Sequence, residues 1–140
     1  MNSKELLTAY AEGQRDFTDA NLTGAYLTGA NLTGAYLTGA VLPRFQICPE
    51  EGSFTCYKKL DSGVIALTIT TEAKRTSSLV GRKCRAEFVM PHGSGTSDRG
   101  GVYVEGKMYY PDSYDDDIRV ECTHGVHFFI TRQEAEEYTP

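Results

Sequence analysis

The sequence has no long apolar segment. Its N-terminal part lacks the apolar run that a secretory signal needs. No other part approaches the roughly 18 consecutive apolar residues that a membrane-spanning helix requires. These absences predict a cytoplasmic protein with no membrane partner.

Motifs of the common catalytic sites are missing too. The chain has no nucleophile elbow, no phosphate-binding loop and no paired-carboxylate motif. A catalytic site would have to use scattered residues, with Cys122 as nucleophile and His124 or His92 as base. Asp112 or Asp117 would then orient that base. Nothing in the pattern distinguishes this arrangement from a buried thiol, so the sequence favours a non-enzyme without deciding the question.

Cysteines are few, and none forms a CxxC pair. They are Cys48, Cys56, Cys84 and Cys122. This spacing predicts reduced, buried thiols in a cytosolic protein. A tetrahedral zinc site is also compatible with two of the cysteines and two histidines. Its ligands would be Cys84, Cys122, His124 and His127, but their spacing matches no established zinc pattern, and we predict no metal and no cofactor.

The chain has no excess of basic residues. Its formal net charge is −5, with 9 basic and 7 acidic residues between 45 and 110, but 2 and 8 between 111 and 140. Proteins that bind polyanions generally have a net basic surface with interleaved aromatic residues. An acidic tail would repel a phosphate backbone. The charge distribution therefore argues against a nucleic-acid partner.

What the sequence does have is a five-residue repeat over residues 15–44. The quintets read RDFTD, ANLTG, AYLTG, ANLTG, AYLTG and AVLPR. No helix or strand has a period of five, so each quintet needs a short segment of its own, bounded by a turn. The A-(N/Y)-L-T-G pattern resembles the pentapeptide-repeat family.

That resemblance implies a mainly β fold, in which residues 15–44 form a short right-handed quadrilateral β-helix of about one and a half coils. Leucines and alanines would point inward. Such a short solenoid cannot bury its own ends. In residues 1–14, Ser3 suits an N-cap and Gly13 a helix stop, which predicts a cap helix on one end. The second end must be covered either by the following domain or by another copy of the chain, and exposed ends favour homo-oligomers that stack through the β-helix.

After Pro43 the pattern changes to short strands separated by turn signals. The predicted strands are 53–59, 64–69, 83–90, 101–104, 107–110, 118–122 and 126–130. Thr131 and Glu134 form a capping box that predicts a helix over residues 132–138. Residues 45–140 are therefore predicted to be a small antiparallel α+β domain that ends in a helix.

Several motifs in this part carry a second resemblance. They are Tyr57-Lys-Lys59, Ala73-Lys-Arg75, Arg82-Lys-Cys-Arg85 and the run from Glu121 to Arg132. Together they resemble an uncharacterised domain of tailed-phage and bacterial proteins that commonly follows pentapeptide repeats. The resemblance implies a phage origin, and hence the cytoplasm of a host cell, but it implies no activity.

The segment from Ala73 to Ala86, which we call the basic island, holds five cations and three consecutive hydroxyls but no acidic residue. Guanidinium groups bind phosphate bidentately, and hydroxyls complete an anion site. We predict ligand contacts from the basic island, from Tyr109 by stacking and from His124 as a donor. The island residues are Lys74, Arg75, Thr76, Ser77, Ser78, Arg82, Lys83 and Arg85. Alternatively, these cations pair with the acidic residues 112–117 and Glu121.

Three functional hypotheses follow. The first is a non-enzymatic module that binds an anionic, nucleotide-like small molecule and, in a phage, sequesters a nucleotide immune signal of the host. The second is a protein-interaction module that presents Tyr26, Tyr36 and the acidic stretch to a host protein. The third is a small hydrolase or transferase that acts on the same ligand. Mimicry of DNA is disfavoured because the outward positions of the repeat are not rows of acids.

Overall fold

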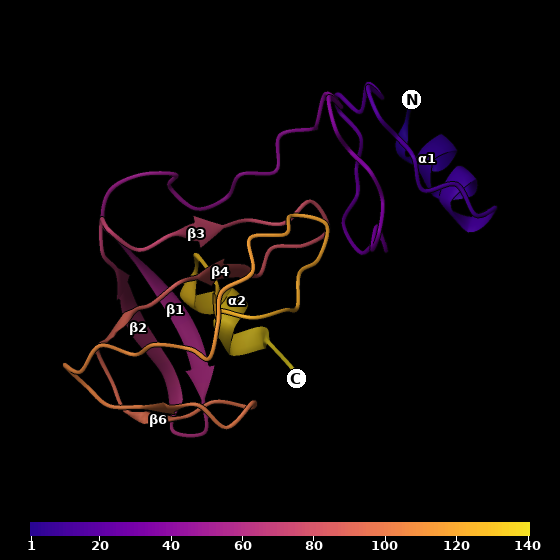
Figure 1. The fold of residues 1–140 in the computed structure, drawn as a ribbon. Coiled ribbons are helices and arrows are strands. Elements are labelled where there is room, and N and C mark those ends of the chain that lie inside the picture. Colours follow the sequence, from indigo (N-terminus) through magenta and orange to yellow (C-terminus); the bar gives the residue numbers. More distant parts are fainter.

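Three small antiparallel sheets and two helices make up the regular structure of this mainly β chain, whose computed structural model describes residues 1–140 (Figure 1). The helices are α1 (Ser3–Ala11) and α2 (Arg132–Glu137). The strands are β1 (Phe54–Leu60), β2 (Gly63–Ile69), β3 (Arg75–Thr76), β4 (Cys84–Ala86), β5 (Met90–Pro91), β6 (Gly95–Thr96), β7 (Val102–Tyr103) and β8 (Val126–Phe128). They form the sheets β1-β2-β5, β3-β4-β8 and β6-β7. Neither helix has the length and apolarity needed to cross a membrane.

The repeat segment (residues 15–44) returns beside itself after twenty residues. Parallel bridges pair Asp16 with Tyr36 and Asn21 with Val41. The turn glycines at positions 24, 29, 34 and 39 have φ values of 70–80°, a conformation that suits glycine. The Asn21 side chain caps its turn by accepting a hydrogen bond from the Thr23 amide at 3.1 Å. The five-residue period therefore corresponds to one turn per quintet.

Apolar residues of the repeat segment are buried together at the centres of the quintets. They include Phe17, Leu22, Leu27 and Leu32, each at most 3% exposed. Leu6 of α1 is fully buried in the same cluster. The N-cap of α1 is Asn2 and not Ser3 as predicted, because the Asn2 side-chain oxygen accepts the Glu5 amide at 2.9 Å. Thus α1 packs on one side of the repeat segment.

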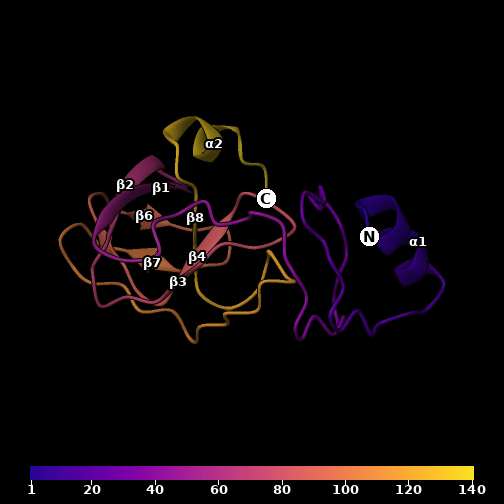
Figure 2. The same cartoon turned by 90° about the horizontal axis from the view of Figure 1, so that it is seen from above.

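The other side of the repeat segment is covered by Leu79 and Val80, from the loop between β3 and β4. Both residues belong to the same hydrophobic cluster as the repeat leucines. The Gly29 amide donates to the Val80 carbonyl at 2.8 Å, and Arg119 Nη1 donates to the Ala35 carbonyl at 2.7 Å. Figure 2 shows the repeat segment between α1 and the sheets. Residues of the domain that follows the repeats therefore pack on this side of the repeat segment.

The second hydrophobic cluster lies between the sheets and holds residues of β1, β2, β4 and β8. Strand β1 pairs with β2 along its whole length, and Tyr57 makes a bridge to Phe129 that joins this sheet to the next. Helix α2 packs on β1 and β2. Its N-cap is Thr131, whose hydroxyl accepts the Glu134 amide at 3.2 Å, as the capping box predicts.

Three of the predicted strands are absent or divided, and two more, 101–104 and 126–130, are shorter than predicted. Residues 107–110 contribute only an isolated bridge between Tyr109 and Val89. Residues 118–122 form a turn, because carbonyls of this segment accept hydrogen bonds from the Arg85 guanidinium instead of from a neighbouring strand. The predicted strand 83–90 is divided into β4 and β5, which belong to different sheets.

Candidate functional site

Arg85, near the C-terminal end of the basic island, is completely buried. Its guanidinium donates to four main-chain carbonyls, of which two lie in the acidic stretch 112–117: those of Asp115 at 2.9 Å and Asp117 at 2.7 Å. The other two acceptors belong to Val120 and Glu121. Burial lowers the pKa of Arg85, and the nearby Asp115 opposes that shift. Arg85 therefore holds the 115–121 loop in place and does not face a cavity.

The other arginines of the basic island are also engaged within the chain. Arg75 donates to four carbonyls, among them those of Gly52 at 2.8 Å and Thr70 at 2.9 Å. Arg82 pairs with Glu134 at 2.6 Å on the surface, which raises the pKa of Arg82. The alternative pairing with residues 112–117 is thus realised only for Arg85, and there through the main chain.

The hydroxyls of the island lie inside the fold. Ser77 Oγ accepts the amides of Ile47 at 3.0 Å and Cys48 at 3.3 Å. Ser78 is buried, and its hydroxyl accepts the Val80 amide. The Thr76 hydroxyl bonds to that of Tyr114. These three groups fix the β3–β4 connection, so they do not form the predicted anion cradle.

The island lysines separate as well. Lys74 is exposed and lines a shallow cavity with Arg75 and Thr76. That cavity has more acidic than basic lining residues, which disfavours an anion: the acidic ones are Glu50, Glu51, Glu72 and Asp116. Lys83 turns to the other side of the sheet, where its Nζ lies 3.5 Å from Cys122 Sγ. The basic island is therefore not brought together into one site.

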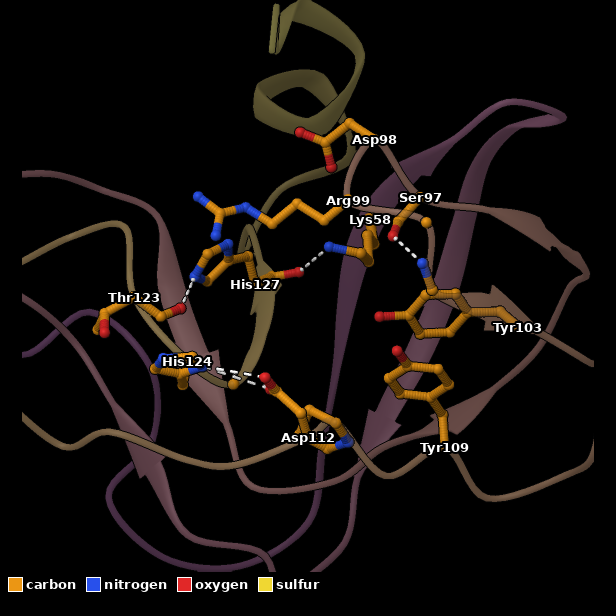
Figure 3. Close-up of a pocket in the computed structure, with 14 residues that line it drawn as sticks. Lys58, Ser97, Asp98, Arg99, Tyr103, Tyr109, Asp112, Thr123, His124 and His127 are labelled. Carbon is orange, nitrogen blue, oxygen red and sulfur yellow. Dashed lines mark hydrogen bonds and ion pairs between the residues drawn. The ribbon is translucent and has the colours of Figure 1, made fainter.

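A different cavity, of about 680 Å³, gathers polar and aromatic side chains from distant parts of the chain. We call it the central cavity. It lies between β1, the 97–101 loop, residues 109–112 and residues 123–127 (Figure 3). Its volume falls within the roughly 300–1,000 Å³ of small-molecule sites. Two of the predicted ligand residues, Tyr109 and His124, line it.

Lys58 reaches the central cavity from β1. The alternation of a strand places it on the same face as the buried Cys56 and Leu60. Its Nζ donates to the His127 carbonyl at 2.9 Å and lies 5.9 Å from the centre of the Tyr103 ring. Burial lowers the pKa of Lys58 to about 8, and the carboxylate of Asp98 only partly opposes this shift.

His127 is 8% exposed, and its Nε2 lies 2.7 Å from the Thr123 carbonyl, to which it donates. Burial, followed by repulsion from Lys58, lowers the pKa of His127 to about 4. The residue is thus a neutral, packed histidine at neutral pH. No group of three or more His, Cys, Asp or Glu in the chain is arranged to hold a metal ion, so the zinc hypothesis has no geometric support.

His124 and Asp112 face each other at the rim of the central cavity. His124 Nδ1 lies 3.2 Å from Asp112 Oδ2, and both side chains are more than half exposed. The Ser113 amide, and after it His124, lowers the pKa of Asp112. Asp112 therefore orients the imidazole: when Nδ1–H donates to the carboxylate, Nε2 of the neutral ring is a hydrogen-bond acceptor, and only the imidazolium has a second N–H to donate.

An aromatic wall completes the central cavity. The rings of Tyr103 and Tyr109 are stacked with centroids 4.0 Å apart and planes 19° apart. Burial raises the pKa of the Tyr103 hydroxyl. Gly101 packs so closely that a Cβ there would lie 2.4 Å from the Tyr109 hydroxyl. A glycine is needed at this position so that the 97–101 loop can approach the aromatic pair.

Arg99 extends from the same loop toward Cys122, with Nη2 2.8 Å from Sγ. Cys122 is exposed, which corrects the prediction that all four cysteines are buried; the other three are. Of the other residues in the catalytic hypothesis, His92 bonds to Thr68 and Asp117 to Arg119, and neither makes a hydrogen bond to Cys122 or His124. The oriented imidazole of His124 remains available to it.

Sequence reasoning missed Lys58 and Arg99 as site residues. The signal for Lys58 was its place on the inward face of a strand between two apolar residues. The signal for Arg99 was its position as the one cation in the polar Ser97-Asp-Arg-Gly-Gly101 loop. Together these side chains give the central cavity two cations beside an aromatic wall, an arrangement suited to an anionic ligand that carries a ring.

Two family models match the chain. Residues 16–44 match the model described as pentapeptide repeats (8 copies), and residues 44–135 match a family of unknown function, DUF5758. No curated protein and no solved structure matches. The second match spans most of the chain. The chain therefore belongs to the family of unknown function DUF5758, in an arrangement where pentapeptide repeats precede that domain.

Proposed function

We propose that this protein binds a small anionic ligand with a planar ring, such as a nucleotide, in the central cavity. The observation that carries the proposal is the convergence of Lys58 and Arg99 on a cavity of about 680 Å³ walled by Tyr103 and Tyr109. This convergence brings together residues from four separate segments. It replaces the basic island as the candidate anion site.

Each group has a role that its chemistry suits. The Arg99 guanidinium can hold two oxygens of a phosphate, and the Lys58 ammonium adds a point charge. The Tyr109 ring offers a face for stacking a base. Asp98 and Asp112 also line the cavity, and their charges limit how much negative charge it accepts. The site therefore favours a mononucleotide-sized ligand over a polyanion.

In biological terms, we propose that the protein sequesters a nucleotide immune signal in the cytoplasm of a host cell, as a phage counter-defence sponge. The repeat segment would be a short right-handed quadrilateral β-helix, a proposal supported by its return after twenty residues. A homo-oligomer would need a surface other than the ends of the repeat segment, since Leu6 covers one side and Leu79 and Val80 the other.

A hydrolase or transferase acting on the same ligand is the second candidate. The observation in its favour is the imidazole of His124, oriented by Asp112 at the rim of the central cavity. Cys122 is close to this region in sequence, but its polar contacts are to Arg99 and Lys83. A nucleophile in contact with His124 is therefore missing, which ranks this candidate below simple binding.

The proposal is tested by incubating the purified chain with a nucleotide panel that includes cyclic oligonucleotides and ADP-ribose derivatives. Mass spectrometry then measures which compound is depleted and in what form it is recovered after the protein is heated. We expect depletion and intact recovery. Arg99→Gln should weaken binding by about tenfold or more, because hydrogen bonds to charged groups contribute roughly 1.5–3 kcal/mol.

Arg82→Gln is the matched control, since it removes one guanidinium from the basic island and leaves the central cavity unchanged. A loss of binding in Arg82→Gln but not in Arg99→Gln would return the site to the island. Recovery of an altered compound would favour the hydrolase or transferase. No depletion at all would favour the protein-interaction hypothesis, with Tyr26 and Tyr36, exposed by 75% and 63%, as its first candidates.

A further inference from the structure

Lys58 differs from the other lysines of this chain in where its amine lies. Lys4, Lys59, Lys74 and Lys107 are exposed. Lys83 is buried, but its Nζ lies 3.5 Å from Cys122 Sγ and from the Tyr138 hydroxyl, and it does not line the central cavity. Lys58 lies on the inward face of β1, and its Nζ points into the central cavity (Figure 3). The neighbouring Lys59 lies on the opposite face of the same strand. Two lysines adjacent in sequence therefore have different surroundings.

The amine of Lys58 is held in place but not neutralised. Its one recorded hydrogen bond is to the His127 carbonyl at 2.9 Å, and no carboxylate forms a salt bridge with it. The carbonyl acceptor orients the amine and uses one of its N–H bonds, so the other N–H bonds remain directed to the cavity. The Tyr103 ring lies 5.9 Å from Nζ. This geometry presents a positioned amine to whatever occupies the cavity.

We propose that Lys58 is a carbonyl-reactive amine, which forms an imine with an anionic aldehyde or ketone bound in the central cavity. This inference deepens the proposed function and rests on it, because the same cavity must first hold the anionic ligand. It names the ligand class more narrowly: a ring-bearing anion with a free carbonyl, such as an ADP-ribose derivative whose terminal ribose is in the open-chain form, or a pyridoxal-type phosphate.

Imine formation needs no reactant besides the Lys58 amine and the carbonyl compound. The lone pair of the neutral Lys58 Nζ attacks the carbonyl carbon, and a C–N bond forms. The carbonyl oxygen then leaves as water, taking the two hydrogens that the amine gives up. The product is a C=N double bond that water can hydrolyse again. Only the neutral form of Lys58 can begin this sequence.

The surroundings of Lys58 favour that neutral form. Burial lowers its pKa to about 8, Asp98 on the 97–101 loop raises it, and the cations of Lys83 and Arg99 lower it again. The other titratable groups that face it are Cys56 on β1, His127 on β8 and Tyr103 on β7. At pH 7 roughly a tenth of Lys58 is neutral, against less than about a thousandth of an ordinary lysine.

Pyridoxal 5′-phosphate is the probe, because it combines an aldehyde, a planar ring and a phosphate. The full chain is mixed with a limiting amount at pH 7, reduced with sodium borohydride and mapped by peptide mass spectrometry. We expect the label on Lys58 first. The rate of labelling should be half-maximal near pH 8, whereas the exposed lysines should react mainly at higher pH.

Two variants test whether the label depends on the amine of Lys58. Lys58→Arg keeps a cation and cannot form an imine, so the label should fall at least about tenfold. Lys59→Arg is the matched control one residue along the strand, and it should leave labelling unchanged. Mapping of the unaltered chain needs no variant and stands even if Lys58→Arg does not fold, which circular dichroism would reveal.

The proposed function and this inference fail in different ways. Label spread over the exposed lysines, in a chain that still depletes a nucleotide, overturns the reactive lysine and leaves the binding site intact. Label on Lys58 in a chain that depletes no nucleotide supports the lysine chemistry and overturns nucleotide binding. Nucleotide added before the probe should protect Lys58 from labelling. A lack of protection at saturating nucleotide would place the two ligands in different sites, and it would overturn the claim that they share the central cavity.

Discussion

Two groups of cations in this protein have opposite surroundings. In the basic island, residues 73–86, the guanidinium of Arg85 is buried among carbonyls and that of Arg82 pairs with Glu134. Around the central cavity, Lys58 and Arg99 come from distant segments and line open space. The difference teaches that a dense run of cations in a sequence can be the internal framework of a loop. Isolated cations, placed by long-range topology, can make the site.

Among the variants that test this comparison, Arg85→Lys should have the largest effect on stability. A lysine cannot reach the four carbonyls that the guanidinium contacts, so several buried acceptors lose their partner. We expect the free energy of unfolding to fall by about 3–5 kcal/mol, the usual cost of breaking a buried charged contact. Urea denaturation measures it. A loss below about 1 kcal/mol would mean that Arg85 is not the framework we describe.

The second prediction concerns His127, which lines the central cavity, and the pH dependence of stability that it causes. The pKa of His127 is about 4 in the fold, against an ordinary value of 6.5, so between these values the unfolded chain binds more protons. Stability should therefore rise with pH across this window and be lost as pH falls through it. Across this window the free energy of unfolding should change by about 3 kcal/mol.

His127→Gln is the matched variant, since an amide can still donate to the Thr123 carbonyl. Its unfolding midpoint in urea should vary less between pH 4 and 6.5 than that of the unaltered chain. Carboxylates with lowered pKa values, such as Asp117 and Glu134, lose their contribution as pH falls below about 4.5, at the acid end of this window. They do so in both proteins, so the difference between the two profiles reports on His127. Equal pH profiles for the two proteins would contradict a buried, neutral His127.

The smallest effect is expected for Arg82→Ala. The Arg82 side chain is 57% exposed, and an exposed ion pair contributes roughly 0–1 kcal/mol. The free energy of unfolding from urea titration should change by no more than that amount, and added salt should reduce the difference further. A loss above about 2 kcal/mol would show that the whole basic island, and not Arg85 with Arg75 alone, serves as framework.

The sequence predicted those parts of the fold that local patterns control. The period of five placed a turn after each quintet, because each turn depends on residues within the same quintet, such as Asn21 and Thr23. The strands β1 and β2 and the helix α2 were predicted within a few residues of their bounds. The segment 118–122 was not, because its backbone is held by a side chain that lies more than thirty residues earlier.

The candidate site was predicted only in part, for a related reason. Tyr109 and His124 were named and do line the central cavity. Lys58 belongs to a pair of lysines and Arg99 is the one cation of its loop, so neither stands in a dense basic run. Only the pairing of strands and the closure of loops bring them together. Composition drew attention to the basic island, where the density of charge reflects the many carbonyls that Arg75 and Arg85 hold.

The cover of the repeat segment also bears on how such a gene can be rearranged. Leu79 and Val80 share a cluster with leucines of the repeats, although they belong to the part of the chain that matches DUF5758. A recombination event that cut the chain at residue 44 would leave both halves with apolar surface in water. Repeats and domain are therefore expected to be inherited together, and a new partner domain would have to supply an apolar pair in the place of Leu79 and Val80.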